Sequence, residues 1–227
     1  MTPLILIPGM MCDARMWGDT SSLPTSIHHY LPNQADTITD LAQMILHTAP
    51  PQFALAGLSM GGIVAMEILR QAPSRVTHLA LLDTNPLAET PEANARRLPQ
   101  IAKVETGGLA AVMRDEMKPN YLADTLRKPQ ILDLCMDMAL TLGPDTFVRQ
   151  SRALASRPDQ TATLAAYQGP ALILMGEQDR LCPRPRHDLM HALMPQSRLV
   201  IIEHAAHLPT LENPTQTTAA LIRWLED

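Results

Sequence analysis

Residues 53–69 read FALAGLSMGGIVAMEIL. A short apolar run leads into a serine flanked by glycines, and an apolar pattern with helical spacing follows it. This order predicts a buried strand, a sharp turn and a helix, with the Ser59 hydroxyl projecting from the turn. Gly57, Gly61 and Gly62 suit a turn where the strand and helix approach too closely for a Cβ atom. Ser59 can also be read as a helix N-cap, but capping alone does not explain glycines on both sides.

The composition favours a single globular domain in a reducing compartment. A chain of 227 residues can bury a full core. Lysine and arginine total 18 against 23 aspartates and glutamates, a net charge of -5, and the basic residues are scattered, so we expect no nucleic acid partner. The cysteines are odd in number, far apart and without metal-ligand spacing. They are Cys12, Cys135 and Cys182. We therefore expect a cytoplasmic protein without a metal site.

The N-terminal segment predicts a buried strand and no membrane association. Residues 1–9, MTPLILIPG, lack the basic n-region of a signal peptide. Their apolar run is also too short for a signal core or a membrane span. We expect this run to enter the sheet.

Short apolar runs alternate with helical patterns along most of the chain. Continuous apolar runs suit strands buried on both faces, and their alternation with helices implies a parallel sheet with right-handed crossovers. The expected strands are residues 4–7, 53–56, 79–82, 171–175 and 199–202, with a weaker candidate at 26–31. The chain is therefore predicted to adopt a doubly wound α/β fold with a mostly parallel sheet of about six strands.

The segment from residue 86 to residue 167 breaks this alternation. It contains no convincing strand and carries amphipathic stretches separated by Pro and Gly. We interpret it as a helical lid inserted into an α/β core formed by residues 1–85 and 168–227.

Two sets of side chains in this segment are candidates for lining a pocket, although core packing or solvation is the commoner role of each. The methionines are Met113, Met117, Met136 and Met138. The arginines, which can pair with a substrate carboxylate, are Arg96, Arg97, Arg114, Arg149 and Arg152.

A nucleophilic serine needs a base, and the base needs an orienting carboxylate. Asp179 lies in the loop after the expected strand at 171–175 and is the preferred acid. Glu177 in the same loop and Asp83, at the end of the preceding strand, compete with it. Each can instead be a loop carboxylate that forms a turn or caps a helix.

The base and the oxyanion donors complete the arrangement. Two histidines, His204 and His207, follow the strand at 199–202, and either gives the order serine, acid, histidine that suits this architecture. We prefer His207, and this preference depends on its pairing with Ser59 and Asp179 and on the resemblance described below. The expected oxyanion donors are the backbone N–H groups of Met60, next to the serine, and of Met10, in the loop after the first strand. Taken alone, the loop containing Met10 reads as an ordinary strand-ending turn.

Taken together, these motifs resemble the α/β-hydrolase superfamily, most closely small lidded esterases and enol-lactonase-like hydrolases. The resemblance covers nearly the entire chain. The segments that carry it are residues 6–9 with Trp17, 57–62, 81–84, 156–159, 174–179 and 204–214. It implies Ser59 as nucleophile, Asp179 as acid, His207 as base, and Met10 and Met60 as backbone oxyanion donors.

The chain departs from the family pattern without losing a reacting group. Pro8 stands where many relatives have a histidine, Leu58 replaces a common histidine, and Ala206 replaces a glycine. A hairpin that often precedes the first core strand, and a loop rich in Asp and Gly after the second strand, are not visible. The resemblance therefore implies a reduced version of the fold.

The function expected from these residues is hydrolysis of a small-molecule carboxylic ester or lactone through an acyl-enzyme on Ser59. No metal or organic cofactor is required for this chemistry. A lyase, perhydrolase or carbon–carbon hydrolase can use the same residues, because fold and constellation do not fix the reaction. A slow-turnover ligand receptor is a rival of another class, which stoichiometric binding without multiple turnovers would favour.

Overall fold

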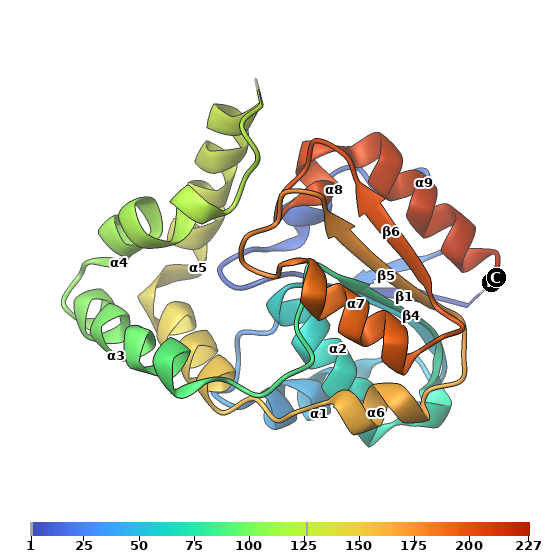
Figure 1. Cartoon of the computed structure of the whole chain (residues 1–227). Helices are drawn as coiled ribbons and strands as arrows, with labels where there is room; N and C mark the ends of the chain where they lie inside the picture. The colour runs from blue at the N-terminus through green and yellow to red at the C-terminus, as the bar shows by residue number, and fades with distance from the viewer. Residues whose placement is uncertain (1, 126) are drawn as a thin grey trace.

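The computed structural model describes residues 2–125 and 127–227, and in this part of the chain six parallel strands form one sheet in the order β2-β1-β3-β4-β5-β6 (Figure 1). The strands are β1 (Leu4–Ile7), β2 (Ile27–His29), β3 (Phe53–Leu58), β4 (Val76–Leu82), β5 (Ala171–Gly176) and β6 (Arg198–Ile202). The predicted strands are confirmed, including the weaker candidate that corresponds to β2. The all-parallel sheet also confirms the predicted fold class.

Helices cover both faces of the sheet. One face carries α1 (Ile38–Thr48), α2 (Met60–Gln71), η2 (Pro73–Arg75), α6 (Thr161–Ala166) and α7 (Arg184–Leu193). The other carries η1 (Ala14–Trp17), α8 (Pro209–Glu212) and α9 (Pro214–Leu225). Along β3, Leu55 packs into the first core and Ala56 into the second. Because both faces are buried, this strand is a continuous apolar run and shows no polar alternation.

The segment between β4 and β5 is helical throughout its regular elements. It contains α3 (Pro91–Glu105), α4 (Leu109–Ala111), η3 (Val112–Met117), η4 (Lys118–Asn120), α5 (Lys128–Ala155) and α6. Helix α5 bends at Gly143, where φ is 79°, and Pro144 follows the bend. Like the other described helices, it lacks a stretch long and apolar enough to cross a membrane. Figure 1 shows α3, α4 and α5 to one side of the sheet, whereas α6 packs against α2 and α7.

The turn between β3 and α2 brings backbones into contact without intervening side chains. A Cβ atom on Gly57 would clash with the carbonyl oxygen of Gly61, and one on Gly61 would clash with the carbonyl oxygen of Ile7. These atoms belong to the backbone of a sheet and a helix, so moving them away would disturb the hydrogen bonds of both. The glycines predicted to permit close packing therefore do so at Gly57 and Gly61. At Gly62 a Cβ atom would lie 2.7 Å from the side chain of Thr84, which is also too close.

Replacing Gly61 by alanine is expected to lower the free energy of unfolding by about 1–3 kcal/mol, the usual range for overpacking a tight site. The reason is that β1 and α2 must separate to admit the methyl group. Urea denaturation followed by circular dichroism measures the change. Gly107→Asn is the comparison variant, because no neighbouring atom lies within 4 Å of the point that its Cβ would occupy, so that its cost is backbone strain alone at a φ of 93°. Equal stability of Gly61→Ala and wild type would contradict the close approach.

His187 on α7 makes the stability of the fold depend on pH. Its side chain is fully buried, and no hydrogen bond of acceptable geometry reaches either ring nitrogen, although the Pro183 carbonyl lies nearby. Burial lowers the pKa of His187 to about 4. The unfolded chain binds a proton near the ordinary histidine pKa of about 6.5. Unfolding therefore takes up a proton between these values, and stability falls as the pH drops from about 6.5 towards 4.

The variant His187→Leu is expected to lose less stability between pH 7 and pH 5 than wild type, by about 2 kcal/mol, because no buried imidazole remains to be protonated on unfolding. Denaturation midpoints at the two pH values measure the difference. His47→Leu, at an exposed position on α1, serves as the control and is expected to keep the wild-type pH dependence. Parallel curves for wild type and His187→Leu would refute the assignment.

Candidate active site

The turn after β3 presents the Ser59 side chain away from the helix that follows. Ser59 has φ 56° and ψ -118°, and its N–H donates to the Leu82 carbonyl at 2.9 Å. Its own carbonyl accepts from the Gly62 N–H at 3.0 Å and from the Thr84 hydroxyl at 2.7 Å. The Ser59 side chain makes no helix-capping hydrogen bond. Ser59 thus occupies the N-cap position of α2, but its side chain does not cap the helix, and its hydroxyl is left for another partner.

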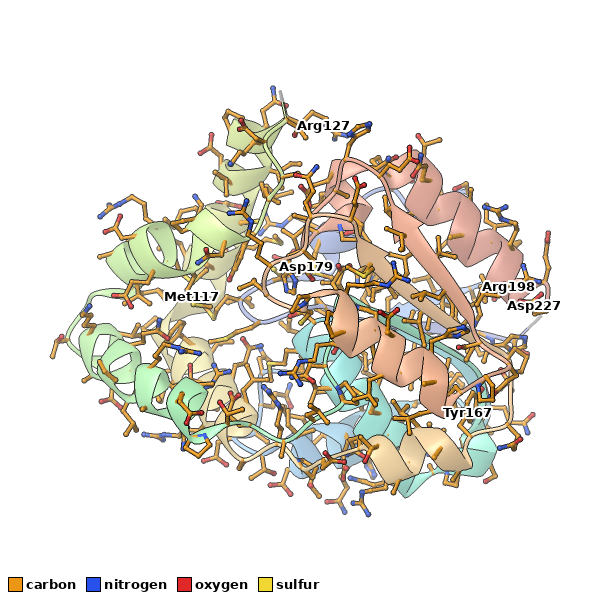
Figure 2. All side chains as sticks on the ribbon, viewed as in Figure 1. Met117, Arg127, Tyr167, Asp179, Arg198 and Asp227 are labelled. Carbon is orange, nitrogen blue, oxygen red and sulfur yellow. The ribbon has the colours of Figure 1, made fainter. Side chains whose placement is uncertain are left out.

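That partner is His207, which links the hydroxyl to a carboxylate. The Ser59 Oγ lies 2.9 Å from His207 Nε2, and His207 Nδ1 lies 2.9 Å from Asp179 Oδ2. Ser59 follows β3, Asp179 lies in the loop after β5 and His207 lies in the loop after β6. The carboxyl edge of the parallel sheet therefore brings the three residues together. In Figure 2, Asp179 lies in the middle of the molecule, between the sheet and the helices that carry Met117. The structure thus joins the three residues that sequence analysis singled out.

Of the three carboxylates considered as the acid, Asp179 is the one that contacts His207. Its second oxygen, Oδ1, accepts from the N–H groups of Leu181 at 2.8 Å and Cys182 at 3.1 Å. Burial by itself would raise the pKa of Asp179, but the charge and hydrogen bond of His207 and the N–H donors lower it to about 2. The carboxylate is therefore ionised at any working pH. Glu177, by contrast, is exposed.

Asp83 lies beside Asp179 and has a different role. It is fully buried, and its Oδ1 accepts from the Gly176 N–H at 2.9 Å. Burial and the negative charge of Asp179 raise the pKa of Asp83 well above its usual range, which favours the neutral carboxyl. The Asp83 Oδ2 atom has no hydrogen-bond partner among the described residues. A proton on this oxygen can be donated to Asp179, which accounts for a second buried carboxyl at this place.

Glu212 holds the loop that contains His207, a role that sequence analysis missed. Its Oε2 accepts from the N–H groups of Ala206 at 2.9 Å and Leu208 at 3.1 Å, on either side of the histidine. Its Oε1 accepts from the Ala123 N–H at 2.7 Å, in the helical segment. Burial raises the pKa of Glu212 in spite of these three bonds. The available signal was a glutamate five residues after a candidate base, directly before Asn213 and Pro214.

The competing histidine, His204, stays outside this arrangement. It is exposed, with φ 57°, at the start of the loop after β6. The His207 N–H donates to the Tyr121 carbonyl at 2.9 Å, so the helical segment also fixes the position of the preferred histidine.

Met10 and Met60, whose backbone N–H groups are the expected oxyanion donors, both line the cavity that contains Ser59. Met60 begins α2, where an N–H has no partner within the helix. Among the described residues, no acceptor is assigned to the Met10 N–H either. The neighbouring Met11 N–H is held by the buried Gln150 side chain at 2.9 Å. This contact, between residues far apart in the chain, shapes the loop and was not foreseen.

The cavity has a volume of about 510 Å³, within the usual range for small-molecule sites. Ser59 and His207 both line it. Of the four candidate methionines only Met117 does so, while Met113 and Met138 are buried in the two cores. A larger cavity of about 750 Å³ lies between α2 and α6 and contains none of the candidate residues. The chemistry therefore points to the smaller cavity.

Cys182 lies close to the same residues, and its sulfur, a carboxylate oxygen of Asp179 and a ring nitrogen of His207 all lie within 4.8 Å of one another. Burial, and then the charge of Asp179, raise the pKa of the Cys182 thiol well above its usual range. A metal ion here would have to deprotonate this thiol and compete for the side chains that pair Asp179 with His207. The geometry therefore fits a serine–histidine–carboxylate arrangement better than a metal site.

Curated proteins with similar sequences align with most of this chain. Two curated relatives are pimeloyl-[acyl-carrier protein] methyl ester esterases. The one from Aromatoleum aromaticum is 25% identical over 240 residues and 93% of each chain. The one from Nitrosomonas europaea is 27% identical over 199 residues, which are 80% of this chain and 74% of the relative.

Solved structures show the same fold, and a family model covers it. A thermophilic esterase from Thermogutta terrifontis with malate bound has a TM-score of 0.90 and 27% identity, covering 100% of this chain and 90% of the other. The enol-lactonase from Burkholderia xenovorans LB400 has a TM-score of 0.88 and 19% identity, covering 100% and 92%. The model described as the alpha/beta hydrolase family matches residues 4–221. The predicted resemblance is thus confirmed, and the chain belongs to the alpha/beta hydrolase family.

Proposed function

We propose that this chain hydrolyses a small-molecule carboxylic ester or lactone through an acyl-enzyme formed on Ser59. The observation that carries the proposal is the continuous hydrogen-bonded series from the Ser59 hydroxyl through His207 to Asp179, with 2.9 Å at each step. A serine hydroxyl becomes a useful nucleophile only when a positioned base takes its proton. The names of the curated relatives, which are methyl ester esterases, support ester hydrolysis over the other reactions open to such a site.

In the first half of the reaction, His207 Nε2 takes the proton of Ser59 as the oxygen attacks the carbonyl carbon. The resulting oxyanion accepts hydrogen bonds from the Met10 and Met60 N–H groups. His207 then donates its proton to the leaving oxygen as the ester bond breaks. The alcohol departs, or stays attached in a lactone, and the acyl group remains on Ser59.

In the second half, His207 takes a proton from water, whose oxygen attacks the acyl carbonyl, and then returns that proton to Ser59. Asp179 accepts from the other ring nitrogen throughout. Its carboxylate fixes the tautomer that leaves Nε2 able to accept, and stabilises the imidazolium that forms. We further propose that α3, η3 and α5 act as a lid over this site, because Arg96, Met117 and Leu154 from these helices line the same cavity as Ser59.

The variant Ser59→Ala is expected to lose activity by about a millionfold, as removal of the nucleophile does in comparable sites. Hydrolysis of short-chain aryl esters and covalent labelling by a fluorophosphonate probe measure the loss. Ser74→Ala, at an exposed serine after α2, is the control and should retain both signals. Full activity of Ser59→Ala, together with resistance of wild type to the probe, would rule out the proposal.

The pH profile of kcat/KM is expected to fall in acid with a slope of one. Protonation of His207 removes the base, whereas Asp179 stays ionised because its pKa is about 2. Initial rates between pH 4 and pH 9, on enzyme shown to remain folded, measure the profile. A flat profile would exclude a titrating base, and a slope of two would show that a second group must also be deprotonated.

The two buried aspartates are expected to respond differently to the same change. Asp179→Asn removes the charge that orients His207 and should lower kcat by about 10⁴-fold, as in a serine protease where the equivalent change was made. Asp83→Asn replaces a neutral carboxyl by a neutral amide that still donates and accepts, and should keep activity within about tenfold. Steady-state kinetics of both variants at neutral pH measure the contrast. The reverse order would make Asp83 the orienting acid.

A further inference from the structure

The cavity that contains Ser59 is rich in arginine although the chain as a whole is acidic. The net charge of the protein is -5. Five arginines nevertheless line this cavity, and the described lining includes a single carboxylate, that of Glu89. The arginines are Arg96, Arg97, Arg157, Arg180 and Arg186. Positive charge is therefore concentrated at the place where a substrate would bind.

Two of these arginines have an internal partner. The Glu89 side chain is only 4% exposed, and its Oε2 lies 2.6 Å from Arg97 Nη2. Its Oε1 lies 3.0 Å from Arg157 Nη2, and Arg157 also donates from Nε to the Leu87 carbonyl at 3.0 Å. One carboxylate is thus shared by two guanidinium groups. This cluster shapes the cavity wall and already carries excess positive charge.

The other three arginines form no ion pair with any described carboxylate. Arg96 lies on α3, Arg180 follows β5, and Arg186 lies on α7, so they approach the cavity from the helical segment and from the core. Arg96 and Arg180 are exposed, and Arg186 is partly buried. Their guanidinium groups are available to a ligand.

The positive charge also lies near the reacting groups. Arg180 directly follows Asp179 in the chain. Arg157 and Arg186 are close enough to Cys182 to oppose the rise that burial causes in the pKa of its thiol. The Cys182 sulfur in turn lies within 4.8 Å of Asp179 and His207. An anion held by these arginines would therefore share the cavity with a carbonyl group placed at Ser59.

We propose that Arg96, Arg180 and Arg186 form an anion subsite, and that the substrate is an ester or lactone bearing a second group that is a carboxylate or a phosphate. The planar guanidinium binds both anions through paired, charge-assisted hydrogen bonds. Such bonds gain strength in a cavity that is partly shielded from water. This inference rests on the proposed function, because it assigns the substrate class of the same site.

Only part of this subsite coincides with the arginines expected from the sequence. Arg96 and Arg97 reach the cavity, but three others do not line it. Arg114 pairs with Asp115, Arg149 donates to the Asn33 carbonyl, and Arg152 faces Glu105. The remaining cavity arginines belong to loops and a helix for which the sequence predicted no anion-binding role. They are Arg157, Arg180 and Arg186.

Matched pairs of esters test the proposal. Monomethyl adipate is compared with methyl hexanoate, which has a methyl group in place of the distal carboxylate. Likewise, 3-acetoxypropyl phosphate is compared with propyl acetate, so the two pairs distinguish a carboxylate on the acyl side from a phosphate on the alcohol side. We expect kcat/KM to favour the charged member of at least one pair by about 10- to 100-fold. The preference should decrease with added salt, chiefly through KM.

Arginine variants assign the preference to the subsite. Arg186→Gln alone, and together with Arg96→Gln and Arg180→Gln, should bring the ratio between charged and neutral esters towards one. Arg114→Gln is the matched control, since Arg114 is exposed, paired with Asp115 and outside the cavity. A wild-type preference for neutral esters, or variants that slow both members of a pair equally, would overturn the proposal.

Binding measured without turnover separates this proposal from the proposed function. Adipate and inorganic phosphate are titrated into wild type and Ser59→Ala by calorimetry and thermal shift. If adipate or phosphate binds to wild type and to Ser59→Ala but not to the triple arginine variant, the subsite is supported, even if no ester is hydrolysed. Absence of binding, combined with Ser59-dependent hydrolysis of neutral esters alone, refutes the subsite and leaves the proposed function intact.

Discussion

The contact between backbones at the turn after β3 is the constraint on which the rest of the structure depends. Because Gly61 has no side chain, α2 starts against the Ile7 carbonyl, and because Gly57 has none, the helix begins directly over the end of its strand. The carboxyl ends of β1 and β3 are thereby held together beneath Ser59. The serine takes the positive φ that this tight turn demands, and its hydroxyl stands clear of the backbone. The same close approach brings the Met10 loop, which follows β1, next to the first N–H of α2.

Around this turn, the buried acids are kept compatible with one another by their protonation states. Three carboxyl groups gather near His207, and three negative charges in so small a volume would repel one another strongly. Asp179 is ionised because it faces the imidazole and two N–H donors, while the raised pKa of Asp83 favours a neutral carboxyl that can donate to Asp179. Glu212 accepts three backbone N–H groups instead of facing the imidazole directly. His207 therefore forms a hydrogen bond to a single charged carboxylate, that of Asp179. This bond fixes the tautomer of the imidazole.

The sequence predicted best those features that depend on residues close together in the chain. Apolar runs located the strands, and the glycines around Ser59 predicted the turn, because both depend on residues adjacent in the chain. Choosing among Asp83, Glu177 and Asp179 was harder, since all three follow strands that end at the same edge, and only loop geometry separates them. The hydrogen bond between Met11 and Gln150 had no sequence signal at all, as its partners are 139 residues apart. The sequence could have predicted that Arg180 lies near the site, because Arg180 occupies the same loop after β5 as Asp179.

The way the helical segment is attached decides which parts of the cavity can vary. Hydrogen bonds at Tyr121, Ala123 and Gln150 are among those that tie it to the core, and these three hold the His207 loop and the Met10 loop directly. A shift of these residues would move the base or an oxyanion donor, so they are tied to the chemistry. Helix α3 packs instead against α5, and Arg96 extends from it into the cavity. Side chains on α3 and on the exposed turns of α7 can therefore change the charge of the cavity while the Ser59, His207 and Asp179 geometry stays the same, which separates substrate selection from the reacting groups.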